Sequence, residues 1–287
     1  DDGFYSMMIG ATDMGTGCDT ILAQMAADCL DTHVDNIVVY GVDTDISPYD
    51  SGSYASSTTY LTGNATIKTC QMLREKIIAA GAEMLEIDIE DADFDGEKVY
   101  SVKEEKSITL KDIANNVMCY SNHTLTATAK EKTPVSPPPY MAGAVEIELD
   151  KETGHVEIID YATCVDCGTV INPALATVQT EGGLVQGIGM ALYEDVQYDK
   201  RGRILNDSFM QYKIPTRLDM GKIRVEYESS YEPSGPFGAK SIGELVINTP
   251  SPALCHAIYN ASGVWINELP MTSEKIAMGI LKNNLEA

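Results

Sequence analysis

The chain is organised around one stretch, Pro236-Phe237-Gly238-Ala239-Lys240-Ser241-Ile242-Gly243-Glu244, which lies between a turn and the apolar run 245–247. Its glycines let the backbone approach a ligand closely or adopt positive φ. Glu244 ends the stretch, and a carboxylate held there is suited to act as a general base. The alternative is a glycine-rich turn with a solvated Glu, and this stretch alone does not decide between the two.

Composition limits the classes of protein to consider. A length of 287 residues is typical of one large domain or two modest ones. A hydrophobic share of 44% with 22% charged residues is that of a globular protein with a core. The net charge of −23 argues against nucleic acid or an anionic membrane as partner. We find no apolar run of membrane-spanning length and no signal peptide, and we expect a cytoplasmic protein that acts on a small molecule.

Cysteine and histidine spacing gives no metal site. Seven cysteines, an odd number without a disulfide-framework spacing, favour reduced thiols. The only CxxC, Cys164–Cys167, has no second pair, and the four histidines are far apart in sequence. We therefore predict that no metal is held by protein side chains.

A glycine motif follows the first predicted strand, 4–9. Its sequence is Thr12-Asp13-Met14-Gly15-Thr16-Gly17, and apolar residues at helical spacing follow it over 21–30. Thr16 and Asp19 resemble a capping box. A Gly-x-Gly at a helix start offers free N–H groups to an anion or to a polar cofactor edge. A capped helix after a tight turn is an equally good interpretation.

The rest of the first half contains a hydroxyl-rich stretch and a boundary. Residues 53–59 are small and hydroxylated, which suits a ligand wall or a surface loop. We predict a helix over 63–80, a hairpin turn at Asp95-Gly96 with strands at 87–89 and 99–102, and a helix over 109–117. Four prolines within 134–139 exclude regular structure and mark the best boundary. The predicted domains are therefore 1–133 and 134–287.

The second half alternates strands and helices. Strands are predicted at 144–149 and 156–162, strands and loops over 198–227, and helices over 252–262 and from 272 onward. A long helix over 172–194 contains four glycines and Gln186. Four interior glycines cost about 3–4 kcal/mol against alanine, so close backbone packing against another element or a cofactor must offset them. Segments 12–16 and 165–169 are alike, and we predict an α+β fold of two similar lobes with mixed sheet and packed helices.

These motifs together resemble the molybdenum-binding subunit of the xanthine dehydrogenase/aldehyde oxidase family of molybdenum hydroxylases. The resemblance covers nearly the whole chain, is most specific at 238–244, and implies the molybdopterin-binding fold of that family. It implies the C-terminal half of the subunit, either the smaller of two polypeptides or a cleavage product, with the other half as a separate chain. In that family the cofactor's dithiolene, not a side chain, holds the metal.

The resemblance assigns roles by position. Met14, Gly15 and Thr16 are expected to contact the pterin, and Glu244 is expected to be the catalytic base. Gln186 and Gly243 are expected near the metal. The pterin phosphate and metal side are expected beside Ala55, Ser56 and Thr58.

Three positions depart from the family pattern. Thr16 stands where Gln is common, Thr58 where Ser is frequent, and Leu245 where Pro is usual. The first puts a side-chain hydrogen bond to the cofactor in doubt, and the last puts the local turn in doubt. Lys240 either orients Glu244 or forms a structural ion pair.

The implied reaction is hydroxylation of a purine, an N-heterocycle or an aldehyde with water as oxygen donor, xanthine dehydrogenase-like chemistry being favoured. The cofactor is molybdopterin or its cytosine dinucleotide form, and iron–sulfur and FAD subunits carry the electrons away. The alternatives are a non-catalytic scaffold half of the same fold, and a module that binds an anionic small molecule.

Overall fold

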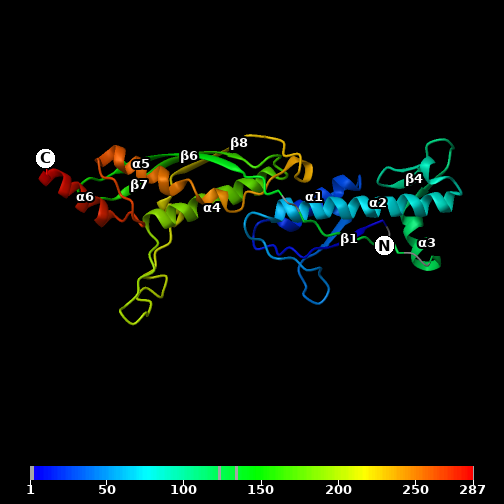
Figure 1. Ribbon diagram of the computed structural model, residues 1–287, viewed down its shortest axis with the longest axis horizontal. Coiled ribbons are helices and arrows are strands. Elements are labelled where there is room, and N and C mark those ends of the chain that lie inside the picture. The colour runs from blue at the N-terminus through cyan, green and yellow to red at the C-terminus, as the bar shows by residue number, and fades with distance from the viewer. Residues whose placement is uncertain (1–2, 122–123, 133–134, 287) are drawn as a thin grey trace. The chain divides into compact units, whose positions relative to one another are not determined.

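The computed structural model describes residues 3–121, 124–132 and 135–286 (Figure 1). The chain divides into two compact units, 1–137 with 231–241, and 138–230 with 242–287. The predicted boundary at residues 133 and 134 lies outside the described residues and stays a prediction. Segment 231–241 belongs to the first unit, although it lies within the second predicted domain. The chain therefore passes from one unit to the other inside the organising stretch, between Ser241 and Ile242.

The first unit begins with a parallel strand pair and a helix. Strands β1 (Tyr5–Met8) and β2 (Ile37–Tyr40) pair in parallel, and α1 (Cys18–Cys29) connects them. Small apolar residues of α1 let it pack closely against α2 (Gly63–Leu85). The buried cluster between these elements consists of Ala23, Ala26, Ala27, Leu30, Ile37 and Cys70.

An antiparallel sheet and α3 (Leu110–Tyr120) complete the first unit. The sheet orders β3 (Ala92–Phe94), β4 (Lys98–Ser101) and β5 (Ser107–Thr109). The predicted turn at Asp95-Gly96 is confirmed, but the strand predicted at 87–89 is wrong. A 3₁₀ turn, Ile89–Asp91, begins there because the Asp88 side chain accepts a hydrogen bond from the Glu90 N–H.

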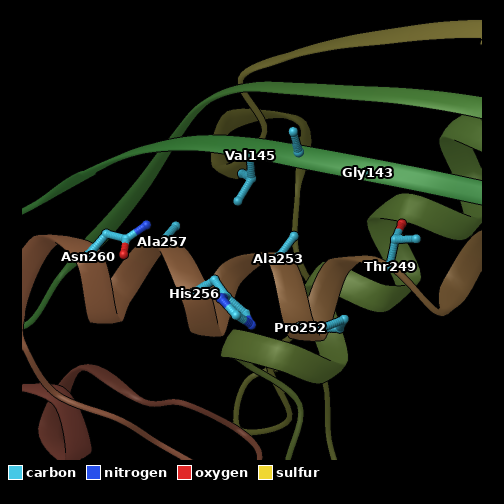
Figure 2. A pocket seen from close by; sticks show the side chains of 9 residues that line it. Gly143, Val145, Thr249, Pro252, Ala253, His256, Ala257 and Asn260 are labelled. Carbon is cyan, nitrogen blue, oxygen red and sulfur yellow. The ribbon is translucent and has the colours of Figure 1, made fainter.

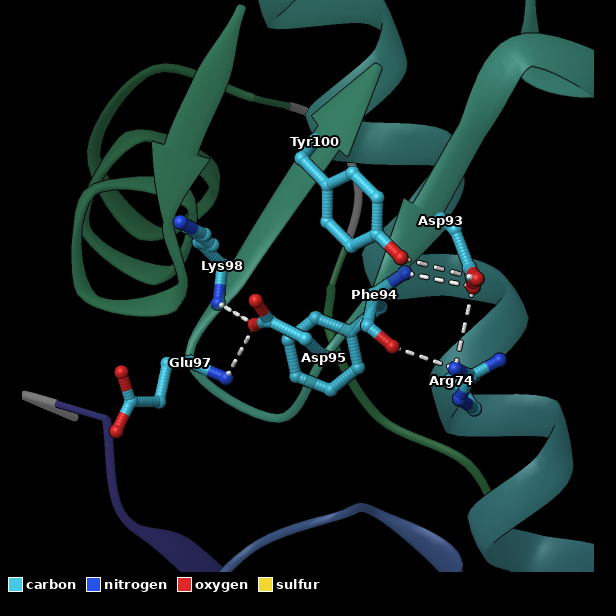
Figure 3. A network of polar contacts seen from close by, with 7 residues as sticks. All are labelled: Arg74, Asp93, Phe94, Asp95, Glu97, Lys98 and Tyr100. Atoms are coloured by element: carbon cyan, nitrogen blue, oxygen red, sulfur yellow. Dashed lines mark hydrogen bonds and ion pairs between the residues drawn. The ribbon is translucent and has the colours of Figure 1, made fainter. Parts of the chain in front are cut away.

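Arg74 anchors this sheet to α2. Its Nη2 donates to Asp93 Oδ1 at 3.2 Å and to the Phe94 carbonyl (Figure 3). The guanidinium carbon also lies 5.9 Å from the centre of the Phe94 ring, and Phe94 is buried. One side chain thus joins helix and strand through an ion pair, a charge-assisted hydrogen bond and a cation–π contact.

We expect Arg74→Ala to lower the free energy of unfolding of the first unit by about 1–2 kcal/mol, because the Phe94 carbonyl loses a charged donor. Lys103→Ala is the control, since it removes an ion pair with Asp91 in which the Lys103 side chain is exposed and solvent screens the attraction. Urea unfolding of both variants measures the difference. Equal midpoints would show that Arg74 is only a surface charge.

The second unit is a mixed three-stranded sheet with helices on one face (Figure 1). Strand β7 (Val156–Asp166) pairs antiparallel with β6 (Tyr140–Leu149) and parallel with β8 (Lys222–Tyr227). The sheet packs against α4 (Pro173–Leu192), α5 (Pro250–Ser262) and α6 (Ser273–Glu286). Its fully buried side chains include Tyr161, Leu184, Ile188, Leu254, Ile258 and Ile276.

The α+β class and the predicted helices are confirmed. The strands expected over 198–227 reduce to β8 and one bridge between Tyr198 and Ile204. Short 3₁₀ turns occur at Val34–Asn36 and Arg217–Asp219. Among the described residues, no helix has the length and hydropathy that crossing a membrane requires.

Candidate functional site

The glycine motif before α1 is shaped by Asp13. Its carboxylate accepts hydrogen bonds from the N–H groups of Gly15 at 2.9 Å, Gly17 at 3.1 Å and Asp19 at 3.4 Å. Gly17 is the N-cap, with φ 75° and no side-chain cap of its own. The capping box predicted for Thr16 and Asp19 is therefore wrong. Asp13, which precedes the helix, accepts hydrogen bonds from N–H groups at its N-terminus. Three of the N–H groups that were expected to bind an anion are therefore already paired.

Electrostatics of this loop follow from the same contacts. Partial burial acts to raise the pKa of Asp13, but the N–H donors outweigh it and hold that pKa below its usual range. Burial, with the nearby charges of Asp13 and Asp19, raises the pKa of the Cys18 thiol to about 12. The ligand atoms of these three residues lie within 4.8 Å of one another. The Asp13 carboxylate already accepts the N–H groups of the loop, so we assign no metal to these three residues.

We expect Asp13→Ala to destabilise the α1 start by about 1 kcal/mol, as loss of a helix cap does. The native pKa of Asp13 is depressed, so its contribution is present above the unfolded pKa near 4 and is lost as pH falls through the native pKa. Thermal midpoints from pH 7 down to pH 3 measure this. The gap between wild type and variant should narrow at the acid end, and a constant gap would contradict the assignment.

The hydroxyl-rich loop lies against the glycine motif. Ser53 Oγ donates to the Thr12 carbonyl at 3.4 Å, and Thr58 Oγ1 donates to Ser53 Oγ at 2.8 Å. Ala55 and Ser56 both have left-handed backbone, with φ of 51° and 53°. Non-glycine residues in this region are strained, and such strain is concentrated at functional sites. Two motifs separated by about forty residues therefore meet, as a shared ligand wall requires.

The organising stretch reaches the same place from its first-unit side. A π-helical turn, Thr58–Thr62, precedes α2, and the Tyr60 N–H donates to Ser241 Oγ at 3.1 Å. The Tyr60 hydroxyl donates to Ser234 Oγ at 2.6 Å. A 3₁₀ turn, Pro236–Gly238, packs its proline against Gly63. Segment 234–241 is thus fixed beside the loop that holds Thr58.

Lys240 is only 8% exposed. Hydrogen bonds from Ser234 lower the pKa of Glu232, and the charge of Lys240 adds to that shift. Lys240 thus lies close enough to Glu232 for their charges to interact within the first unit. Whether Lys240 orients Glu244 or forms a structural ion pair stays a prediction.

In the second unit, α4 holds the end of the stretch. Gln179 Nε2 donates to the Gly243 carbonyl at 3.2 Å, directly before Glu244. Gln186 is seven residues further along and lies on the same helix face. Glu244 and Gln186 are exposed in this chain. The sequence analysis missed Gln179, although its spacing from Gln186 was a usable signal.

The glycines of α4 make this approach possible. A Cβ on Gly183 would lie 2.0 Å from a Val246 methyl, and one on Gly187 would lie 2.6 Å from Pro250 Cγ and 2.8 Å from the Ile247 carbonyl. These neighbours belong to the 3₁₀ turn Leu245–Ile247 and the start of α5. The close packing predicted for the glycine helix is confirmed there. Gly182 is different, because a Cβ there has no neighbour within 4 Å.

The structure therefore gathers the predicted residues in two groups. Met14, Gly15 and Thr16 share the first unit with the loop that holds Ala55, Ser56 and Thr58. Gln186, Gly243 and Glu244 share the second. Their roles toward a cofactor stay predictions.

A separate groove of about 390 Å³ lies between β6 and α5 (Figure 2). Gly143 and Val145 line it from the strand, and Ala253, His256 and Asn260 line it from the helix. None of the predicted site residues lines this groove. The His256 ring packs edge-on against Trp265 at 5.3 Å, which fits a structural contact.

Comparison with known proteins decides the family. Residues 1–221 match the molybdopterin cofactor-binding domain family. The chain belongs to that family. It is 34% identical over 286 residues to the probable hypoxanthine oxidase XdhD of Escherichia coli strain K12, covering 98% of this chain and 30% of that protein. It is 33% identical to the 6-hydroxypseudooxynicotine dehydrogenase complex subunit gamma of Paenarthrobacter nicotinovorans, covering 96% and 36%.

Solved structures give the same fold for this molybdopterin cofactor-binding chain. Quinoline 2-oxidoreductase from Pseudomonas putida 86 matches with a TM-score of 0.86 and 27% identity, over 96% of this chain and 36% of that one. The Cu,Mo-CO dehydrogenase matches with a TM-score of 0.83 and 26% identity, over 97% and 36%. The chain thus spans about a third of the length of these relatives. The predicted family and fold are confirmed.

The first-unit residues fit a polar ligand such as the pterin. The Thr16 hydroxyl is buried, and its polar neighbour among the described residues is the Cys18 thiol, which is only a weak hydrogen-bonding group. Gly15 has φ 102°, and a Cβ there has no neighbour within 4 Å. The open backbone beside this weakly satisfied hydroxyl leaves room for a polar group that would pair with it.

Proposed function

We propose that this chain is the C-terminal part of the molybdenum-binding subunit of a molybdenum hydroxylase. Its reaction is the oxidation of a purine, an N-heterocycle or an aldehyde with water as oxygen donor, xanthine dehydrogenase-like chemistry being favoured. The observation that carries this proposal is the anchoring of the Gly243 carbonyl by Gln179, on the α4 face that also carries Gln186. That anchor fixes the backbone before an exposed carboxylate, as a general base needs.

Molybdopterin, or its cytosine dinucleotide form, supplies the molybdenum centre that accepts electrons from substrate when it is bound. Gly15 lets the backbone approach the pterin, and Met14 and Thr16 flank it. The Thr58 hydroxyl and the strained Ala55-Ser56 backbone would hold its phosphate and metal side. Gln186 donates a hydrogen bond close to the reacting centre.

Glu244 is the base in this proposal. A carboxylate oxygen of Glu244 accepts the proton that the attacking water-derived oxygen loses. Glu244 is exposed in this chain. In the complete subunit, the remainder covers this side chain and excludes bulk water from it. Iron–sulfur and FAD subunits then carry the electrons away.

The anionic-ligand alternative has lost its strongest support, since Asp13 occupies N–H groups at the α1 start. The scaffold alternative predicts that Glu244 is dispensable, and it is tested in the Discussion.

Cofactor retention tests the proposal directly. We expect this polypeptide purified alone to hold far less than stoichiometric molybdenum, because it carries only some of the motifs through which the family contacts the cofactor. Co-expression with the remainder of the subunit should give about one molybdenum per complex. Metal analysis of both preparations decides, and a co-expressed complex without molybdenum would reject the function.

A further inference from the structure

The loop between α4 and β8, residues 193–221, carries large apolar side chains that the second unit does not cover. Phe209 and Met210 are each 84% exposed, and Leu218 is 97% exposed. Leu205 and Ile214 are also about half exposed. Figure 1 shows the yellow-green part of this loop leaving α4 and projecting away from the β6–β8 sheet. Several large apolar side chains exposed on one loop mark that loop as a candidate interaction surface.

The loop keeps its shape through its own polar contacts. The Tyr212 hydroxyl donates to Glu194 Oε2 at 2.8 Å, and the Gln197 N–H donates to Asn206 Oδ1 at 3.0 Å. A capping box joins Thr216 and Asp219. Further backbone bonds join Asp199 to Arg203 and Leu205 to Gln197. The loop is therefore fixed at both its base and its tip.

Helix α4 is fitted to the base of the loop. A Cβ on Gly189 would lie 2.2 Å from Glu194 Oε1 and 2.9 Å from Pro215 Cδ. Because Gly189 has no side chain, Glu194 and Pro215, one near each end of the loop, can occupy that space. Because the loop is ordered before any partner arrives, binding through Phe209 and Met210 loses little conformational entropy.

We propose that this loop is the docking surface for the remainder of the molybdenum-binding subunit, the portion that lies outside this chain. This inference rests on the proposed function. XdhD and the gamma subunit are each about three times as long as this chain. A subunit of their length contains a large part that this chain lacks. Permanent contacts within a subunit are more apolar than transient ones.

The chemistry of segment 208–212 fits that occupant. Its sequence, Ser-Phe-Met-Gln-Tyr, contains no charge, whereas the hairpin turn 199–203 of the same loop is charged. Aromatic residues and methionine are enriched in interfaces, and charged residues are depleted at their cores. The composition of this segment therefore fits a permanent, apolar partner.

The test is the double variant Phe209→Ser with Met210→Ser, in tagged full chain co-expressed with the remainder of the subunit. Leu285→Ser on α6 is the matched control, because Leu285 is also apolar and 87% exposed. We expect the double variant to recover at least about tenfold less of the remainder, as loss of interface anchors does. The control should equal wild type. Far-UV circular dichroism of both purified chains should stay unchanged.

Recovery equal to wild type in the double variant would overturn the inference. So would a variant that only abolishes self-association of the chain, or only loses the iron–sulfur subunit, since each names another occupant. Leu218→Ser provides a second, independent variant at a 97% exposed position. If the wild-type pair assembles without molybdenum, the proposed function fails while this inference stands.

Discussion

Glu244→Gln is expected to leave molybdenum loading of the assembled enzyme intact and to lower its turnover by a factor of about 10²–10⁴ or more. The substitution keeps the size and most of the hydrogen-bonding capacity of the side chain, but it removes the site that accepts a proton. Gln179 should still hold the Gly243 carbonyl, so the local backbone is not expected to move.

The measurement is steady-state turnover per molybdenum. Glu157→Gln on β7 is the matched control, because Glu157 is exposed in the same unit and far along the chain from the stretch. Cys164→Ser is a second control, since Cys164 is exposed and belongs to a CxxC that we regard as incidental. Turnover near wild type in the Gln variant would remove Glu244 as the base and would favour the scaffold alternative.

Gly187→Ala and Gly182→Ala are expected to change stability in opposite directions, although both lie in α4. At Gly187 the new methyl group would meet the Pro250 ring and the Ile247 carbonyl, neither of which can rotate away. We expect a net loss of about 1–3 kcal/mol from this overpacking. At Gly182 the methyl group meets nothing within 4 Å, so alanine should gain about 0.5–1 kcal/mol from helix propensity.

Chemical denaturation of both variants gives the two signs directly. Gly187→Ala should also reduce turnover of the assembled enzyme, because the displaced segment 245–250 follows Glu244 immediately. Gly182→Ala should leave turnover unchanged. A stabilising Gly187→Ala would mean that the helix and that segment are not in contact.

Much of this chain could be predicted because its signals are local. The spacing of apolar residues located α1 and α2, and the Asp95-Gly96 pair located a hairpin turn. The residues of the glycine motifs and their order along the chain were enough to predict the family. Helix α5 ends at Ser262, as the predicted range 252–262 has it, because Gly263 closes the helix with a φ of 72°.

The errors occurred where a side chain satisfied backbone from an unexpected distance. Asp13 caps α1 across four to six residues, which displaced the predicted Thr16–Asp19 capping box. Asp88 turned a predicted strand into a 3₁₀ turn. Over 198–227, strand-like residues became a loop held by its own polar side chains, and only β8 pairs with the sheet.

The sequence by itself determined the class of fold, the family and the identity of the candidate residues, because residue type and short-range spacing encode them. Only the tertiary structure decided which of those residues meet. It placed Ser53 against Thr12, Ser241 against Tyr60, and Gln179 on Gly243, contacts that span from 41 to 181 residues of sequence. Such contacts form because the folded chain brings groups that are distant in sequence within hydrogen-bonding reach, and sequence spacing does not record which partner is near.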